Sequence, residues 1–199
     1  NISIYPSAAK LAQRGRLYSE DERLDYDVLA YDIDVQLTPD RSVIDGNARL
    51  KLRILENGTS SLTLKLAETV AIRGVYSPDF GRLLHLRVVG QNSLLVNLPS
   101  TIQRNGIIRL TVVYAGRLEP QQIEREGIVL DQQSNTQQEE VYIPVEPQYI
   151  YSNRSYWYPQ NTVTDYATSV MRISVPAEFD VIASGRETAP PAPVPGAVP

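Results

Sequence analysis

Few side chains in this 199-residue chain could do chemistry together. It has no cysteine and a single histidine, His85. Without cysteine there is no disulfide, no thiolate nucleophile and no Cys-ligated metal site. His85 stands in LLHLRVV, where alternation predicts a strand whose Leu84, Leu86 and Val88 face inward. We therefore interpret His85 as a solvent-facing strand residue.

Two carboxylates, Asp32 and Asp34, lie two residues apart on one face of a predicted strand. A carboxylate pair can supply the acid and base of glycoside hydrolysis. Here a basic row, Arg49, Lys51 and Arg53, is predicted on the next strand and explains the aspartates as its cross-strand partners. The chain also lacks a Gly-x-Ser-x-Gly motif and a phosphate-binding loop. We predict no catalytic residue in it.

An aromatic-rich stretch is the most distinctive feature of the sequence. Half of the twelve tyrosines and the only tryptophan fall between Tyr142 and Tyr166. Tyr and Trp pack large areas and often keep a polar end in water, so the stretch is either a core seam or a binding face. Its candidate residues are Tyr149, Tyr151, Arg154, Tyr156, Trp157 and Tyr158.

Alternating apolar and polar residues predict an all-β fold. Strands are expected at 28–37, 48–54, 62–66, 70–76, 83–89, 94–98, 107–114, 171–175 and 179–185. In the first, Leu29, Tyr31, Ile33, Val35 and Leu37 are predicted to share the buried face. Turn residues separate these short strands at regular spacing, which favours an antiparallel β-sandwich or saddle.

The remaining segments suggest the domain limits. Residues 1–25 are an N-terminal extension, with a short helix predicted at 7–18 and a helical turn after the capping box at 19–22. Residues 26–185 are the β-sandwich domain, interrupted by a mobile loop at about 119–140. Residues 186–199 are a Pro-rich tail or linker, expected to be extended.

Composition limits the possible partners and location. A formal net charge of -4 without a basic block argues against a nucleic-acid partner. The sequence contains no run of about 18 apolar residues, so no membrane span is predicted. The chain starts at Asn1 without a leader-like region. Its lack of cysteine fits cytoplasm and periplasm alike, and we favour an extracytoplasmic location.

Several segments, in this order, resemble the N-terminal β domain of the gluzincin zinc aminopeptidases, the family of aminopeptidase N and leukotriene hydrolase. YDIDVQL, a turn and DGNARLKLRIL resemble its opening hairpin, and VVYAGRL resembles a strand and Gly turn midway through it. EPQYIYSNRSYWYP and MRISVPA, followed by a short strand and Gly, resemble its closing part. The matched segments cover most of residues 26–185.

The resemblance implies a zinc site elsewhere. The family binds zinc through His-Glu-x-x-His and a later Glu, which leave one position for water. A chain with one histidine cannot make that motif, and the family's Gly-x-Met-Glu-Asn strand is absent because Met171 is followed by Arg172. The resemblance thus implies a fragment of a bacterial-type aminopeptidase that acts on peptides. Zinc would lie in the catalytic domain of the same polypeptide.

The resemblance also implies a substrate-binding role for Glu146. In the family, an acidic or amide side chain of this domain reaches the active-site mouth and holds the substrate's free α-amine, as an anion opposite an ammonium. Glu146 stands where that residue would be, and Gln148 is a weaker substitute. Arg154 would pair with a carboxylate across the domain interface. The alternative for Glu146 is a surface carboxylate beside a proline kink.

A different class of function stays open on the sequence alone. A stand-alone β-sandwich could bind carbohydrate or protein through its Tyr/Trp-rich face, and an architectural domain of a protein without zinc is a third reading. The orientation of Tyr156, Trp157 and Tyr158 distinguishes them. Rings on an open, flat face favour a binding module, whereas buried rings favour the aminopeptidase domain.

The residue inventory generates a first prediction. We expect the purified chain to contain no stoichiometric zinc by elemental analysis and to release no chromophore from aminoacyl anilides, because it lacks the imidazole ligands. Turnover that survives chelator-free repurification would contradict this prediction.

Overall fold

The structure is a computed structural model that describes residues 25–88, 90–121, 148–161 and 166–188. Within these ranges, the elements are β1 (Tyr26–Thr38), η2 (Pro39–Arg41), β2 (Val43–Ile54), β3 (Thr59–Lys65), β4 (Val70–Ser77), β5 (Gly81–Leu83), β6 (His85–Val88), β7 (Ser93–Ile102), β8 (Ile107–Arg117), η3 (Asn153–Ser155) and β9 (Thr168–Ser174). The predicted all-β fold is confirmed. None of the described segments forms a helix long and apolar enough to span a membrane.

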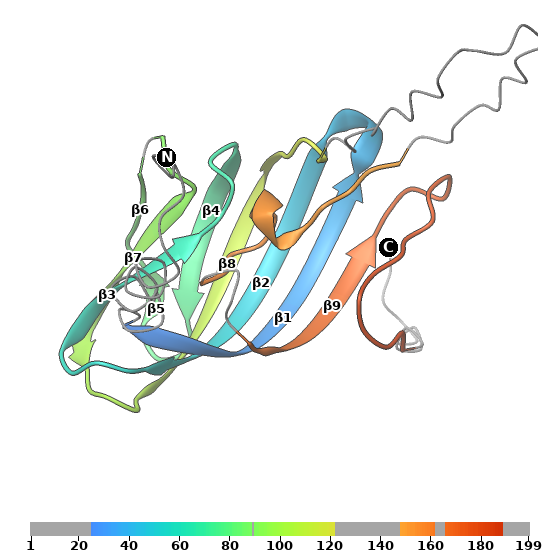
Figure 1. Cartoon of the computed structure of the whole chain (residues 1–199). Coiled ribbons are helices and arrows are strands. Elements are labelled where there is room, and N and C mark those ends of the chain that lie inside the picture. Colours follow the sequence, from blue (N-terminus) through green and yellow to red (C-terminus); the bar gives the residue numbers. More distant parts are fainter. Residues whose placement is uncertain (1–24, 89, 122–147, 162–165, 189–199) are drawn as a thin grey trace, which may run out of the picture.

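The strands form two sheets (Figure 1). The larger has the order β5-β4-β8-β2-β1-β9, and the smaller has the order β3-β7-β6. Residues 1–24, which contain the predicted N-terminal helix and capping box, lie outside the described ranges, as do Glu146, most of the predicted 119–140 loop and most of the Pro-rich tail.

The opening hairpin follows the sequence pattern with one exception. β1 and β2 pair antiparallel from Tyr26 opposite Ile54 to Thr38 opposite Val43. A bulge between Val28 and Ala30 adds one residue to β1. The bulge shifts the alternation, so Val28 is fully buried and the predicted core residue Leu29 is only half-buried. The prediction for Leu29 was therefore wrong.

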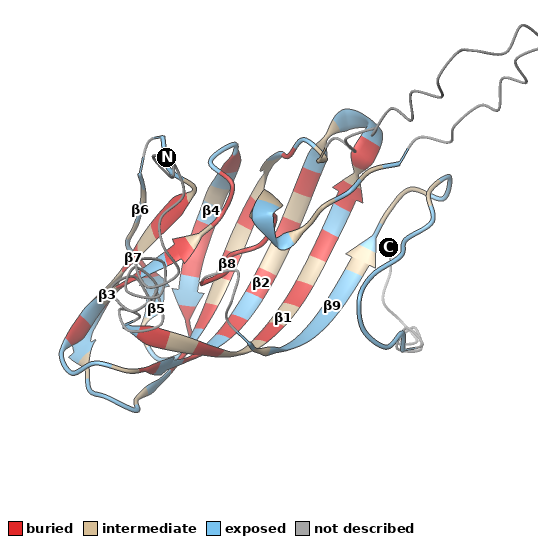
Figure 2. Cartoon of the chain, in the orientation of Figure 1, coloured by how far each residue is buried: buried red, intermediate tan, exposed pale blue. Residues whose placement is uncertain are grey.

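The core lies between the inner faces of the two sheets. Figure 2 shows buried residues alternating with less buried ones along β1, β2 and β8. At the centre, the fully buried ring of Tyr114 on β8 lies over Gly46 on β2, where an added Cβ would come within 2.3 Å of the ring. Glycine is thus required at position 46 because the ring has no room to move.

β9 joins the large sheet in an unexpected direction. It pairs with β1 in parallel, from Ala30 opposite Thr168 to Gln36 opposite Ser174, whereas the other strand pairs are antiparallel as predicted. The long connection after β8 lets the chain return in the same direction as β1. The strand expected at 179–185 is also absent. These residues form no strand in the described part of the chain, and all except the half-buried Phe179 are exposed.

β6 faces the opposite way from the prediction. Leu84, Leu86 and Val88 are 66%, 53% and 40% exposed, whereas His85 is half-buried. The reason is Arg87, whose guanidinium donates hydrogen bonds to three main-chain carbonyls, those of Leu66 and Ala67 after β3 and that of Val70 at the start of β4. Burial lowers the pKa of Arg87. Satisfying three buried carbonyls outweighs burial of the leucines at this edge.

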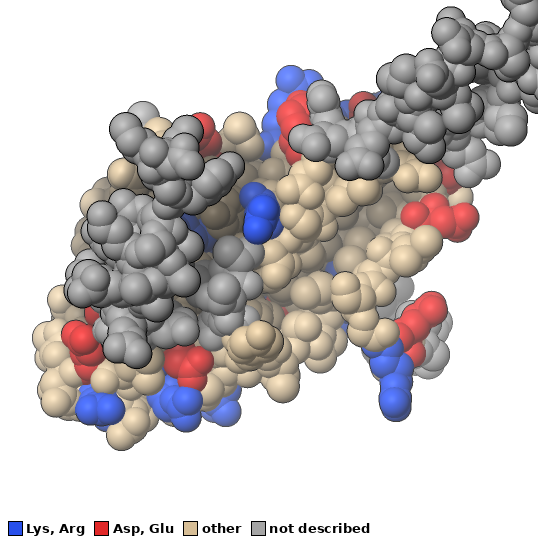
Figure 3. All heavy atoms as spheres, viewed as in Figure 1, with Lys and Arg blue, Asp and Glu red and all other residues tan. Residues whose placement is uncertain are grey.

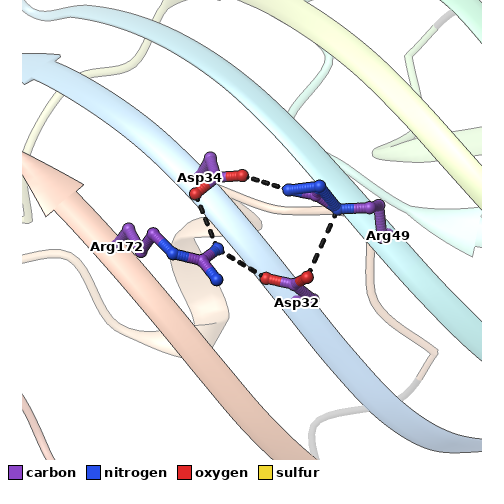
Figure 4. Close-up of polar contacts among 4 residues, drawn as sticks. All are labelled: Asp32, Asp34, Arg49 and Arg172. Atoms are coloured by element: carbon purple, nitrogen blue, oxygen red, sulfur yellow. Dashed lines mark hydrogen bonds and ion pairs between the residues drawn. The ribbon is translucent and has the colours of Figure 1, made fainter. Parts of the chain in front are cut away.

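A four-charge cluster ties β9, β1 and β2 together on the outer face of the large sheet (Figure 4). Arg172 Nη1 lies 2.8 Å from both Asp32 Oδ1 and Asp34 Oδ1. Arg49 Nε lies 3.3 Å from Asp32, and its Nη2 contacts Asp34. The predicted pairing of Asp32 and Asp34 with the basic row is confirmed at Arg49, and Arg172 is an addition. These aspartates are thus ion-pair partners of arginine.

The cluster makes stability depend on pH. Partial burial raises the pKa of Asp34, but hydrogen bonds from Arg172 and Arg49 outweigh it and hold that pKa below its ordinary value. A lowered folded-state pKa stabilises the fold above the unfolded-state pKa of about 3.9, and this contribution is lost as the pH falls through the folded-state pKa. We expect Asp34→Asn to lose less unfolding free energy on acidification than the unmodified chain does, as measured by urea denaturation at several pH values.

Asp40→Asn is the matched control for loss of one exposed carboxylate, because Asp40 lies in a turn, 3.9 Å from the Nε of Arg41. Its acid sensitivity should follow that of the unmodified chain. Equal acid sensitivity of the Asp34 variant would contradict the stabilising role of the cluster.

Candidate functional site

The aromatic segment, residues 148–161, connects the two sheets. In Figure 1 it crosses the inner side of the large sheet in front of β1 and β2. Its end pairs with the edge of β3, where the Lys65 N–H donates to the Gln160 carbonyl (2.7 Å) and the Gln160 N–H donates to the Lys65 carbonyl (2.9 Å). The Ala67 N–H donates to the Tyr156 carbonyl (2.8 Å). Main-chain bonds therefore fix the path of the segment.

A single turn of 3-10 helix, η3, redirects the segment. The Ser152 hydroxyl accepts from the Arg154 N–H (3.2 Å), and the Ser155 hydroxyl accepts from the Ser152 N–H (3.3 Å), which together form a capping box. Tyr156 ends the turn with a left-handed φ of 49°. Such a conformation is uncommon for a side-chain-bearing residue and is held by its surroundings. Arg154 lies exposed on this turn.

The rings of Trp157 and Tyr158 belong to the core. Each is 8% exposed, and they meet edge-on with centroids 4.6 Å apart. Tyr158 also makes an edge contact of 5.4 Å with Tyr31 on β1, and burial raises the pKa of Tyr158. Tyr156 is partly buried against the same core. These three rings do not form an open, flat platform.

Tyr149 and Tyr151 are half-buried at the beginning of the segment. Tyr149 makes an edge contact with Phe179, 5.7 Å between centroids. Burial and the charge of Glu119 raise the pKa of Tyr151. Gln148 is exposed. The structure therefore leaves Gln148 and Arg154 as the candidate polar side chains that reach the surface, while Glu146 is outside the described residues.

Two polar residues at the end of the segment have a structural role that the sequence did not predict. Gln160 and Asn161 are 2% and 4% exposed. Gln160 Nε2 donates to the Asn153 carbonyl (2.9 Å), and Asn161 Nδ2 donates to the Tyr26 carbonyl (3.3 Å). They lock the turn and the first strand in place. The sequence offered no signal for this role, because burial of a Gln and an Asn depends on carbonyl partners elsewhere in the chain.

The described residues hold no group of three or more His, Cys, Asp or Glu side chains that could bind a metal ion. His85 lies on β6, in the smaller sheet, whereas Asp32 and Asp34 are paired with arginines on the outer face of the larger sheet. A zinc ion therefore does not fit the described part of the chain. The aromatic segment can instead hold exposed side chains such as Arg154 in place.

Charge is distributed unevenly around this site. Figure 3 shows the side of the molecule on which the aromatic segment lies, and most of the described surface in this view is neutral, with acidic and basic groups mainly near its margins. A largely neutral surface with few charges is typical of a face that packs against another protein surface.

These features define a class: an all-β domain of two sheets joined by a buried aromatic segment. Among solved structures, this fold is similar to that of one part of M1 zinc metallopeptidases. An M1 zinc metallopeptidase from Deinococcus radiodurans matches 84% of this chain with 21% identity and a TM-score of 0.61. A mutant of that enzyme bound to a Tyr-Ser-Ala substrate, and a two-domain M1 mutant bound to L-arginine, each match 83% with 21% identity and a TM-score of 0.60.

The likeness confirms the fold that the sequence resemblance predicted. The chain spans 36% of the length of each of these metallopeptidases. No known family model and no curated protein sequence matches it. At this level of identity the comparison shows the fold, and activity is a separate question.

Burial of Trp157 generates a prediction. We expect Trp157→Ala to lower the free energy of unfolding by about 3–5 kcal/mol in urea denaturation, because it leaves a large cavity beside Tyr158. Tyr166→Ala is the matched aromatic control, since Tyr166 is 95% exposed, and it should change stability by less than about 0.5 kcal/mol. A fully stable Trp157→Ala variant would show that the ring is not a core element.

Proposed function

We propose that this chain is the non-catalytic N-terminal domain of a zinc metallo-aminopeptidase. The observation that carries the proposal is the two-sheet fold, which matches M1 zinc metallopeptidases over 83–84% of this chain but over only 36% of theirs. The residue inventory agrees, because one histidine cannot supply the family's zinc ligands. Zinc would be bound by a catalytic domain of the same polypeptide, which would hydrolyse N-terminal residues from peptides.

The domain would cap the active-site cleft and help to anchor the peptide N-terminus. Support comes from the rigid attachment of the aromatic segment, whose main chain is bonded to Lys65 and Ala67. Arg154 lies on this rigid element, which can hold a side chain in a defined position opposite a partner group. The role of Glu146, which lies outside the described residues, is supported by the sequence resemblance. We propose that Glu146 holds the substrate's α-amine, with Gln148 as a weaker second contact, and that Arg154 pairs with a carboxylate of the catalytic domain.

The competing function, a binding module with an aromatic platform, receives less support. A platform that stacks on sugars needs ring faces open to solvent, whereas Trp157 and Tyr158 are each only 8% exposed. Burial of these rings is instead the arrangement expected of the aminopeptidase domain.

The natural reading frame tests the proposal first. We expect translation beyond Pro199 to give a His-Glu-x-x-His on a helix with a later Glu, because those ligands complete the zinc site. A continuation that lacks these ligands would overturn the assignment to a zinc aminopeptidase.

In that longer protein, Glu146→Gln should lower kcat/KM for aminoacyl anilides by about 10–100-fold, the effect of losing one charge-assisted hydrogen bond of about 1.5–3 kcal/mol. Gln148→Ala should have a smaller effect. Glu178→Gln, which neutralises an exposed carboxylate, is the matched control and should leave kcat/KM unchanged. Unchanged kinetics in both the Glu146 and Gln148 variants would refute the anchoring role while leaving the domain assignment intact.

A further inference from the structure

The outer face of the six-stranded sheet carries more basic than acidic side chains, although the whole chain has a formal net charge of -4. Register and ion pairs assign to this face the basic residues Arg49, Lys51, Arg53, Arg73, Arg82, Arg109, Arg117 and Arg172 and the acidic residues Asp27, Asp32, Asp34 and Asp45. Positive charge is therefore concentrated on one face of an otherwise acidic protein, and a face of one predominant sign attracts partners of the other.

The acidic side chains of this face are already paired. Asp32 and Asp34 bind Arg49 and Arg172, as described above. Asp27 contacts Arg53, and Asp45 Oδ2 lies 2.8 Å from Arg73 Nη1. All four carboxylates of this face thus form ion pairs with four of its arginines. The other basic residues of the face carry the remaining positive charge.

Lys51 on β2 and Arg109 on β8 are direct cross-strand partners near the middle of the sheet. Both are exposed, and neither makes an ion pair or a side-chain hydrogen bond within the described part of the chain. Like charges placed directly opposite each other destabilise a sheet. An anion supplied from outside would relieve the repulsion between these two cations.

A shallow groove lies over this pair. Its lining includes Ala30, Lys51, Arg109, Pro78 and Thr168. Asp32, Arg49 and Arg172 of the four-charge cluster also line it, and there the Asp32 carboxylate is paired with both arginines. In the cross-strand row that contains the two cations, Lys51 is followed by Ala30 and then Thr168. Small side chains beside two cations leave room for a group such as a carboxylate to reach both.

We propose that this groove is a docking site for an acidic segment of a partner polypeptide, with a Glu or Asp carboxylate held between Lys51 and Arg109. The face already binds carboxylates in this way, since the side chains of Asp32 and Asp34 are each held by two arginines. Lys51 and Arg109 lie on neighbouring strands, so one carboxylate of the segment can contact both cations. The site is on the opposite side of the sheet from the aromatic segment and does not rest on the proposed function.

The test is titration of this chain with a fluorescent oligo-glutamate peptide, followed by anisotropy at about 0.05 M and about 0.3 M salt. Saturable binding is expected at low salt and a weaker affinity at high salt, because the contacts are exposed ion pairs. The double variant Lys51→Glu with Arg109→Glu should weaken binding by at least about tenfold. Arg41→Glu with Arg104→Glu, which changes the charge equally at two exposed turn residues, should retain most of the affinity.

A second variant protects the test against misfolding. Arg109→Glu alone places an opposite charge beside Lys51, so it should raise the thermal unfolding midpoint while weakening peptide binding. If the turn variant and the groove variant lost equal affinity, the proposed site would be wrong, because binding would then depend only on the net charge of the protein. Tighter groove-dependent binding of a sulfated glycan, an oligonucleotide or anionic vesicles than of the peptide would overturn the polypeptide partner.

Discussion

Covering the apolar inner face of the six-stranded sheet is the constraint on which the rest of the structure depends. Alternate residues of β1, β2 and β8 all point to this side and are fully or nearly fully buried. A sheet with one apolar face is stable only when another layer removes that face from water. The three-stranded sheet supplies part of that layer. The rings of Trp157 and Tyr158 supply another part.

The need for a covering layer explains why the aromatic segment is held so firmly. Its rings contribute burial, while its main chain is bonded to the edge of β3 and to the chain after it. The same segment therefore closes the core and carries Arg154 on its exposed turn.

The two sides of the large sheet have separate tasks. The inner side is apolar and covered, whereas the outer side is wet and held in register by ion pairs, with Arg172 joining the parallel edge strand β9 to the central hairpin. Exposed pairs contribute little stability individually. Their network nevertheless uses up the acidic side chains of that face and leaves Lys51 and Arg109 facing each other. The paired charges of this side therefore hold the strands together, and the uncompensated cations are the basis of the proposed docking site.

From the sequence alone it was possible to predict the all-β class, the opening hairpin and the pairing of the aspartates with a basic row, and to see that the chain lacks a His-Glu-x-x-His motif. These follow from period-two alternation and from residue inventory, which are local properties. Tertiary structure alone decided the bulge at Leu29, the parallel pairing of β9 and the reversed facing of β6. It also decided that Trp157 and Tyr158 are core residues. Each of these depends on partners distant in the chain, such as the carbonyls that bind Arg87 or the β1 ring that meets Tyr158. Alternation states which residues share a face, but only the partners across space determine which face is buried.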